Sequence, residues 1–374
     1  SLFYAFYDQG VVYFVMFFIE TLLMRATISY NFLTERYILP FWLQNRVSKR
    51  STNMEVIATD LLRHIYKNLD NPMNKLFVKE KVFKSIRNIR HLREVGDGLG
   101  DIQYDYLKDK SAVYLFSMSR KNKAKDLVIL YIPGTFIISP GNVETHLEYL
   151  SIFIIHLIEQ GFQNPSIYVP RIEGLSTCNE VLQTLHQFVS KILNSNKDCK
   201  YVLAGDSIGG SLVLHLHRQI RKILNVHIIL LVSPILKLFQ EDTIHSNFDY
   251  FNYEELERWA EFHGIRWDFE HELKSCRREN LPKSGFIVSY GEAEAAAKNI
   301  GKFVQSLRNL GCKVKEDCRE NQIHNWGVLN FYTEFLIDHR EESLFRYSNQ
   351  LALILLATSN GYFANTDGNI ARNV

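Results

Sequence analysis

A serine lies where a strand-like stretch meets a helix-like stretch, in the run GDSIG at residues 205–209. This run fits the pattern Gly-x-Ser-x-Gly, in which a strained turn presents the serine hydroxyl at the end of a strand. The chain approaches itself closely beside that serine, and glycine tolerates such an approach. An ordinary strand-to-helix turn with a serine cap would need only one glycine. The pattern and its context therefore favour Ser207 as a nucleophile.

A serine nucleophile needs a base, and the base needs an acid that orients it. In sheets where the serine occupies such a turn, the order along the chain is serine, acid, histidine. Glu292 and Glu294 follow Gly291 at the end of a strand-like run, and His324 lies in a later loop. We expect His324 to be the base and prefer Glu294 as the acid, with Glu292 as the alternative. Four other histidines fall on predicted helices or strands or in an insertion, and we expect structural roles for them: His217, His227, His263 and His271.

Strand-like and helix-like stretches alternate over most of the chain. Apolar runs predict strands at 126–134, 165–171, 200–207, 226–234, 284–292 and 312–318. Apolar residues at three-and-four spacing predict helices at 145–161, 178–194, 209–224 and 295–311. This alternation is typical of an α/β protein with a mostly parallel, doubly wound sheet. Ligand sites on such sheets lie at the carboxyl ends of the strands.

The chain of 374 residues can bury a sizeable core, and its length allows one large domain or two. We expect N-terminal membrane-anchor or interfacial helices over 1–50, a sheet-based domain over 51–340 and a C-terminal tail over 341–374. Within the domain, residues 239–282 form a charged, aromatic insertion that reads as one or two helices of a cap. The polar residues at the end of the tail are expected to fray.

Charge and cysteine content exclude some function classes. A net charge of +2 gives no strong electrostatic attraction to nucleic acid, so we expect no nucleic-acid partner. The five cysteines show no spacing typical of a metal site, and their odd number argues against a disulfide framework. We therefore expect no metal and no organic cofactor.

The apolar segment at residues 10–24 lies close to the N-terminus of the sequence. Together with the preceding SLFYAFY it is about long enough to span a bilayer, although Asp8 and Glu20 weaken that interpretation. Arginines and an aromatic stretch suited to a membrane interface follow it, which favours a cytosolic position for the rest of the chain. The alternative is a helix of a lid over an apolar pocket. The segment predicts membrane association through a single anchor.

The sequence resembles the hormone-sensitive-lipase-like branch of the α/β-hydrolases over about residues 125–335. The likeness rests on four stretches, GDSIGGSL, LLVSPILKL, SYGEAE and IHNW. Within that branch it is most similar to fungal membrane-anchored steryl acetyl hydrolases, in several of which the acid stands three residues after the strand-end glycine, as Glu294 does. The resemblance implies an α/β-hydrolase fold with a helical cap and an N-terminal membrane-associated helix.

One loop departs from the family pattern. Family members carry His-Gly-Gly-Gly-Phe where this chain has IPGTF at residues 132–136, and the usual Leu-Ala-Pro-Glu region is altered to VPRIEGL. The resemblance implies that backbone N–H groups of Gly134, Thr135 and Ile208 hold the oxyanion. Pro133 has no N–H to offer.

The resemblance implies a membrane-associated serine ester hydrolase that acts on a lipophilic ester, such as a sterol or fatty ester, through Ser207, His324 and Glu294. We expect the chain at a membrane, that of the endoplasmic reticulum, with the side left open and membrane proteins as possible partners. The altered loop keeps a second hypothesis open, a weak or inactive hydrolase-fold subunit of a membrane complex. Acyl transfer to an alcohol would use the same residues.

Overall fold

The computed structural model describes the sheet-based part of the chain and some residues before and after it. The described residues are 22–23, 26–40, 53, 56–57, 59–60, 63, 101–109, 111–134, 146–171, 178–195, 199–237, 249, 256–257, 260–261, 268–320, 322–328 and 347–357. The predicted anchor at 10–24, apart from Leu22 and Leu23, lies outside them, as do Thr135 and most of the insertion at 239–282.

An eight-stranded sheet with the order β1-β2-β4-β3-β5-β6-β7-β8 forms the centre of the molecule. Strand β2 pairs antiparallel with β1 and β4, and the other pairs are parallel. The predicted α/β class with a mostly parallel sheet is therefore confirmed. The strands are β1 (Ile102–Tyr106), β2 (Ala112–Ser117), β3 (Leu127–Ile132), β4 (Pro165–Pro170), β5 (Lys200–Asp206), β6 (Val226–Val232), β7 (Phe286–Gly291) and β8 (Val314–Arg319).

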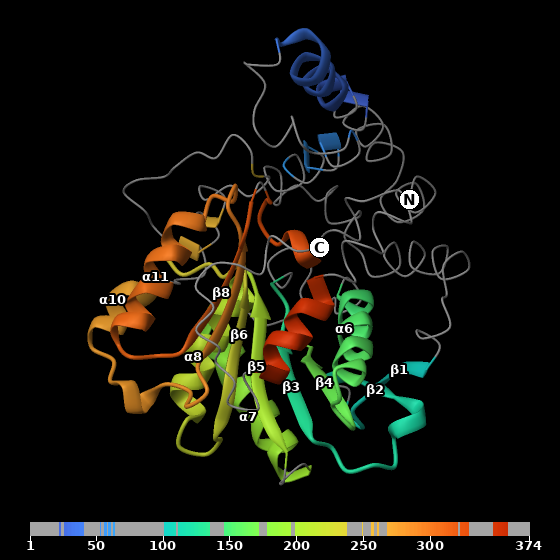
Figure 1. The fold of residues 1–374 in the computed structure, drawn as a ribbon, viewed down its shortest axis with the longest axis vertical. Helices are drawn as coiled ribbons and strands as arrows, with labels where there is room; N and C mark the ends of the chain where they lie inside the picture. The colour runs from blue at the N-terminus through green and yellow to red at the C-terminus, as the bar shows by residue number, and fades with distance from the viewer. Residues whose placement is uncertain are drawn as a thin grey trace.

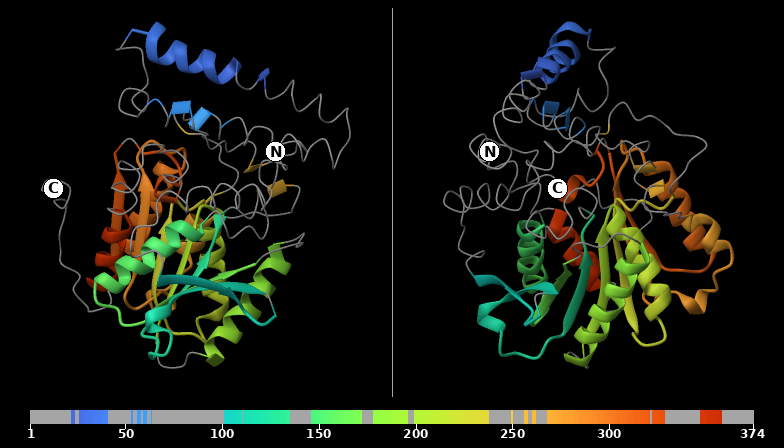
Figure 2. Two further views of the ribbon diagram at one scale, coloured as in Figure 1. Left: turned by 90° about the vertical axis from the view of Figure 1, so that its right-hand side faces the viewer. Right: turned by 180° about the vertical axis from the view of Figure 1, so that it is seen from behind.

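Helices cover both faces of the sheet. In Figure 1, α6 (Leu147–Glu159) and the helix of residues 347–357 lie in front of it. Seen from behind in Figure 2, α7 (Cys178–Ser195) and α8 (Ile208–Ile220) cover the opposite face. The helix α11 (Ala297–Asn309) packs on β7 and β8, and the short α10 (Phe269–Lys274) packs against α11.

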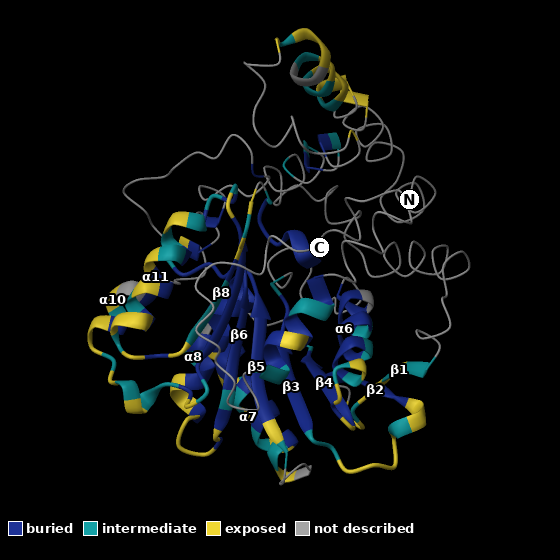
Figure 3. Cartoon of the chain, in the orientation of Figure 1, coloured by how far each residue is buried: buried dark blue, intermediate teal, exposed yellow. Residues whose placement is uncertain are grey.

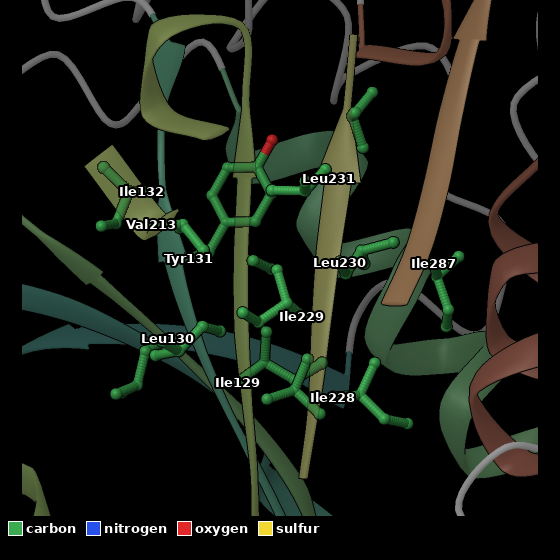
Figure 4. Close-up of a cluster of buried hydrophobic side chains, with 14 of the residues drawn as sticks. Ile129, Leu130, Tyr131, Ile132, Val213, Ile228, Ile229, Leu230, Leu231 and Ile287 are labelled. Atoms are coloured by element: carbon green, nitrogen blue, oxygen red, sulfur yellow. The ribbon is translucent and has the colours of Figure 1, made fainter. Parts of the chain in front are cut away.

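The core lies between the sheet and these helices (Figure 3). Strands β3 and β7 are buried along their whole length, as expected for parallel strands covered on both faces. Figure 4 shows aliphatic side chains of β3, β6 and β7 packed together, with the ring of Tyr131 among them. The hydroxyl of Tyr131 is the polar exception, and it reaches a carboxylate at the carboxyl end of β5, Asp206.

The helix of residues 347–357 belongs to this core. Tyr347, Leu351 and Leu355 are each at most 1% exposed, and the amide of Gln160 at the end of α6 donates to the Asn349 side chain at 2.7 Å. This helix lies within the stretch 341–374 that was predicted as a C-terminal tail, and the ring of its Tyr347 stacks on that of Tyr149 in α6.

The N-terminal residues that the structure describes include a helix over 26–33 that continues into the π-helical turn η1 (Thr34–Ile38). It lies beyond the carboxyl ends of the parallel strands (Figures 1 and 2). Several large apolar side chains of this region are exposed: Leu22, Leu23, Tyr30, Leu33, Tyr37 and Ile38. Among the described residues, no helix combines the length and apolarity that crossing a bilayer requires.

Candidate active site

Ser207 occupies the sharp turn between β5 and α8. Its backbone angles, φ 52° and ψ −124°, lie where residues with a side chain are rarely found, so the turn stores strain. Its N–H is held by the carbonyl of Val232 at 2.9 Å. A Cβ at Gly209 would stand 2.0 Å from the carbonyl oxygen of Ile132. The second glycine of the motif is thus required by the approach of β3 to the turn.

The structure brings three of the predicted residues together at the carboxyl ends of three strands. The His324 Nε2 atom lies 2.9 Å from Ser207 Oγ. On the other side of the ring, Nδ1 lies 3.2 Å from Glu294 Oε2. All three residues are buried, with Ser207 the most accessible at 6%. A serine, an imidazole and a carboxylate linked in this order can activate the hydroxyl for attack.

The two candidate acids occupy different environments. Glu292, directly after β7, is exposed. Glu294 lies in the following turn, where its N–H donates to the carbonyl of Gly291 at 3.3 Å and the residue is 4% exposed. A Cβ at Gly291 would stand 2.1 Å from the carbonyl oxygen of Gln322. The loops that carry the acid and the histidine therefore run in direct contact.

Burial sets the electrostatics of this trio. It raises the pKa of Glu294 well above its usual range, although the Ser233 hydroxyl and the Asn325 N–H act in the opposite direction. Burial likewise lowers the pKa of His324, against the carboxylates of Asp249 and Asp206. A lowered pKa keeps the imidazole neutral near pH 7, and the neutral form is the one that can accept the serine proton.

Asp206, the residue before the nucleophile, is the centre of a second polar cluster. Its carboxylate accepts from the Tyr131 hydroxyl at 2.7 Å and from the Asn325 amide at 2.6 Å, and its Oδ1 lies 3.1 Å from His146 Nε2. Burial alone would raise the pKa of Asp206, but His146 and these hydrogen bonds outweigh it and lower the pKa. Asp206 is therefore a buried carboxylate that is kept ionised.

This cluster also takes up one of the expected oxyanion donors. The Gly134 N–H donates to Asp206 Oδ1 at 3.0 Å instead of pointing freely toward the nucleophile. A Cβ at Gly134 would stand 2.6 Å from the Cβ of Ser207, so the loop does lie against the serine. Ile208 is the first residue of α8, and its N–H has no acceptor within the helix. Thr135, the third expected donor, lies outside the described residues.

Four residues around the trio did not emerge from the sequence: Tyr131, His146, Asp249 and Asn325. Tyr131 and His146 read as ordinary members of an apolar strand and an amphipathic helix. Asp249 lies in the insertion, with no fixed spacing to any motif. Asn325, directly after His324, has φ 57°, a conformation that asparagine tolerates better than most residues. The only feature of the sequence that could have pointed to Asn325 is its position directly after His324.

Among the described residues, no group of three or more metal-ligating side chains converges on one point.

The sequence matches no protein-family model, and no curated protein is similar to it in sequence. Its structure is similar to that of an esterase from the bacterial hormone-sensitive lipase family, with a TM-score of 0.60 and 16% identity over 83% of this chain and 99% of the other. One of two fungal esterases from Rhizomucor miehei gives a TM-score of 0.57 and 16% identity over 81% and 97% of the two chains.

A thermostable esterase from Pseudomonas putida gives a TM-score of 0.54 and 13% identity, covering 78% of this chain and 95% of the other. These likenesses establish the α/β-hydrolase fold in the form seen in hormone-sensitive-lipase-family esterases. The expected resemblance to that branch is thereby confirmed at the level of fold. The closer likeness to fungal steryl acetyl hydrolases stays a prediction.

Proposed function

We propose that this protein is a serine carboxylic ester hydrolase that uses Ser207 as nucleophile, His324 as base and Glu294 as orienting acid. The observation that carries the proposal is the continuous series of contacts from Ser207 Oγ through the two ring nitrogens of His324 to Glu294 Oε2, at 2.9 and 3.2 Å. The fold supports it, because the structures similar to this chain are described as esterases.

The geometry suggests a two-stage reaction. Ser207 Oγ attacks the ester carbonyl carbon while His324 takes the hydroxyl proton, which it then gives to the departing alcohol. Water, deprotonated by the same imidazole, hydrolyses the acyl-enzyme and restores the serine. The Ile208 N–H at the start of α8 is the first donor for the oxyanion. A contribution from Gly134 requires its N–H to be shared between Asp206 and the substrate oxygen.

We further propose a lipophilic substrate, such as a sterol or fatty ester, met at a membrane surface. Support comes from the apolar segment at 10–24 and from the exposed apolar side chains of residues 22–38, beyond the carboxyl ends of the strands (Figure 1). An ester dissolved in a bilayer would reach Ser207 from that side of the sheet. Residence in the endoplasmic reticulum and a membrane-protein partner remain parts of this proposal.

The second candidate is a hydrolase-fold subunit with weak or no turnover. One observation favours it: the loop that replaces the glycine-rich oxyanion loop has one residue without an N–H, Pro133, and one whose N–H is bound to Asp206. Loss of one oxyanion donor costs about 10²–10³ in turnover.

Labelling of the purified, folded chain with a fluorophosphonate, together with hydrolysis of p-nitrophenyl esters of increasing acyl length, separates the two candidates. The hydrolase predicts stoichiometric labelling and turnover that rises with acyl length in detergent or vesicles. A folded chain that takes no label, under conditions where a control esterase is fully labelled, would leave only the non-catalytic candidate.

The two glutamates after β7 provide a matched pair of variants. We expect Glu294→Gln to lower kcat by about 10²–10⁴, because the imidazolium formed during attack loses its carboxylate partner. Glu292→Gln, which removes a charge from the exposed side of the same loop, should stay within about 2-fold of wild type. Equal losses in the two variants, measured as kcat on one ester, would contradict the assignment of the acid.

The pH dependence of kcat/KM follows from the direction of the His324 pKa shift. The base must be neutral, and burial lowers the pKa of this imidazole. We therefore expect activity to hold as the pH falls and to drop with a midpoint below about 6.5, the ordinary histidine value. Rates of p-nitrophenyl acetate hydrolysis between pH 4 and 9 test this, and a midpoint above 7 would contradict it.

A further inference from the structure

A second carboxylate, Asp249, lies beside the catalytic trio. It comes from the insertion at 239–282, is 2% exposed, and makes no contribution to the mechanism described above. One of its oxygens, Oδ1, accepts the backbone N–H of His324 at 3.1 Å. The other, Oδ2, accepts the backbone N–H of Ala295, the residue after Glu294, at 2.9 Å. One carboxylate thus bridges the loop that carries the base and the loop that carries the acid.

This bridge acts on the relative position of the two loops. The loops follow different strands, β7 and β8, so the distance between His324 Nδ1 and Glu294 Oε2 depends on how the loops are held against one another. Asp249 binds each loop at or next to its catalytic residue, and through the backbone, which leaves both side chains free to react. A backbone N–H bound by a carboxylate makes a strong, directional hydrogen bond.

We propose that Asp249 is a positioning residue of the active site. It holds the acid loop and the histidine loop in fixed positions relative to each other, and it supplies negative charge that stabilises the protonated form of His324. This inference rests on the proposed function, since it assigns a further residue to the same reaction. It also gives the insertion a role in the chemistry, beyond any covering of the site.

The groups that face Asp249 set the sign of its electrostatic effect. Burial raises the pKa of Asp249 to about 6, and the charge of Glu294 adds to this, while His324 and the two N–H groups lower it. Near pH 7 the carboxylate is therefore mainly ionised. From the N-terminal side, Arg63 Nε donates to the Asp249 carbonyl oxygen at 3.2 Å, and Arg63 itself pairs with Asp60.

The charge of Asp249 opposes the effect of burial on His324. Its carboxylate and that of Asp206 both raise the pKa of this imidazole, which burial lowers. Removing the Asp249 charge should therefore lower the pKa of His324 further. A residue that merely filled space in the insertion would leave that pKa unchanged, so the pKa of His324 distinguishes the two roles.

The decisive measurement is the pKa of His324 by NMR in the full chain with labelled histidine, assigned with a His324→Gln variant. In Asp249→Asn we expect the pKa to fall by at least about 0.5 unit relative to wild type. In Asp249→Glu, which keeps the charge, the pKa of His324 should lie closer to the wild-type value than it does in Asp249→Asn, even if the loops shift. Glu292→Gln is the control and should change the pKa by less than about 0.2 unit.

An unchanged pKa of His324 in folded Asp249→Asn overturns the inference, whether or not the protein hydrolyses esters. If that variant does not fold, Asp249→Glu carries the test: a His324 pKa that moves down in spite of the retained charge also overturns it.

Activity gives a second readout. We expect Asp249→Asn to lower kcat by about 10- to 100-fold with KM within about 3-fold, because misplaced reacting groups slow the chemical step more than they weaken binding. The acidic limb of kcat/KM should move to lower pH with the pKa of His324. Absence of labelling in the wild type would contradict the proposed hydrolase function. If the wild type is labelled but the acidic limb of kcat/KM stays in place in Asp249→Asn, only the role of Asp249 is contradicted.

Discussion

Replacement of Ser207 by alanine is expected to abolish fluorophosphonate labelling and to lower ester turnover by about 10⁴–10⁶. The loss is that large because the serine, histidine and acid act as a unit, and without the hydroxyl there is no covalent intermediate. The fold should survive, since alanine is smaller and meets the same backbone conformation, φ 52°. Far-UV circular dichroism and thermal unfolding of the variant verify this.

A matched control for that variant lies one turn further along α8. Ser211 is also buried, but its hydroxyl donates to the carbonyl of Ile235 and does not face His324. We expect Ser211→Ala to be labelled to the same extent as wild type, with a loss of stability of about 1 kcal/mol. Full labelling of Ser207→Ala would mean that another residue is the nucleophile, and the proposed mechanism would be wrong.

The second large effect is expected from Asp206→Asn, on stability and activity together. The carboxylate accepts from Tyr131, Gly134 and Asn325 and pairs with His146, all within the buried site. An asparagine amide places a donor among these donors. We expect a loss of at least about 3 kcal/mol in the free energy of unfolding, measured by denaturant titration. Turnover should fall as well, because the turn at Ser207 and the loop at Gly134 share this anchor.

The pH dependence of stability adds a signature to this variant. The pKa of Asp206 is lowered in the folded protein, so its stabilising effect is complete above the unfolded value, about 3.9, and is lost as the pH falls through the folded pKa. The stability difference between wild type and Asp206→Asn should therefore be constant between about pH 5 and 8 and should shrink below about pH 4.

Asp101→Asn is the control for Asp206→Asn. Asp101 also accepts several hydrogen bonds, from Ser117 and Ser119, but it is partly exposed and lies away from the site. We expect its replacement to cost no more than about 1 kcal/mol. A similar loss in both variants would show that burial of the Asp206 cluster contributes little.

Much of the fold could be predicted because each signal was local. The buried strands β3 to β7 are short apolar runs, and the helices between them carry apolar stripes. The alternation of strands and helices could therefore be recognised from the sequence without tertiary information. The strands β1 and β2 were not predicted. Only one of the two, β2, is mostly buried, and both pair antiparallel at one edge of the sheet, where no following helix marks them.

The candidate site divides in the same way. Ser207, Glu294 and His324 stand at strand ends in a fixed order, and each could be singled out from its neighbours in the sequence. Asp249 could not, because its partners are two backbone N–H groups, and a backbone group carries no residue type to recognise. The occupation of the Gly134 N–H by Asp206 is likewise a matter of distance across the sheet, which spacing along the chain does not contain.

The helix of residues 347–357 bears on when during synthesis the site is complete. A Cβ at Gly327 would stand 2.1 Å from the ring of Tyr347, and the rings of Tyr347 and Trp326 lie 4.6 Å apart between centroids. The loop after His324 therefore packs against Tyr347, which is translated about 20 residues later than the loop. In a nascent chain that had exposed the sheet but not this helix, the histidine loop would lack this support. Reactivity of Ser207 should thus appear late on the ribosome, after the sheet has formed.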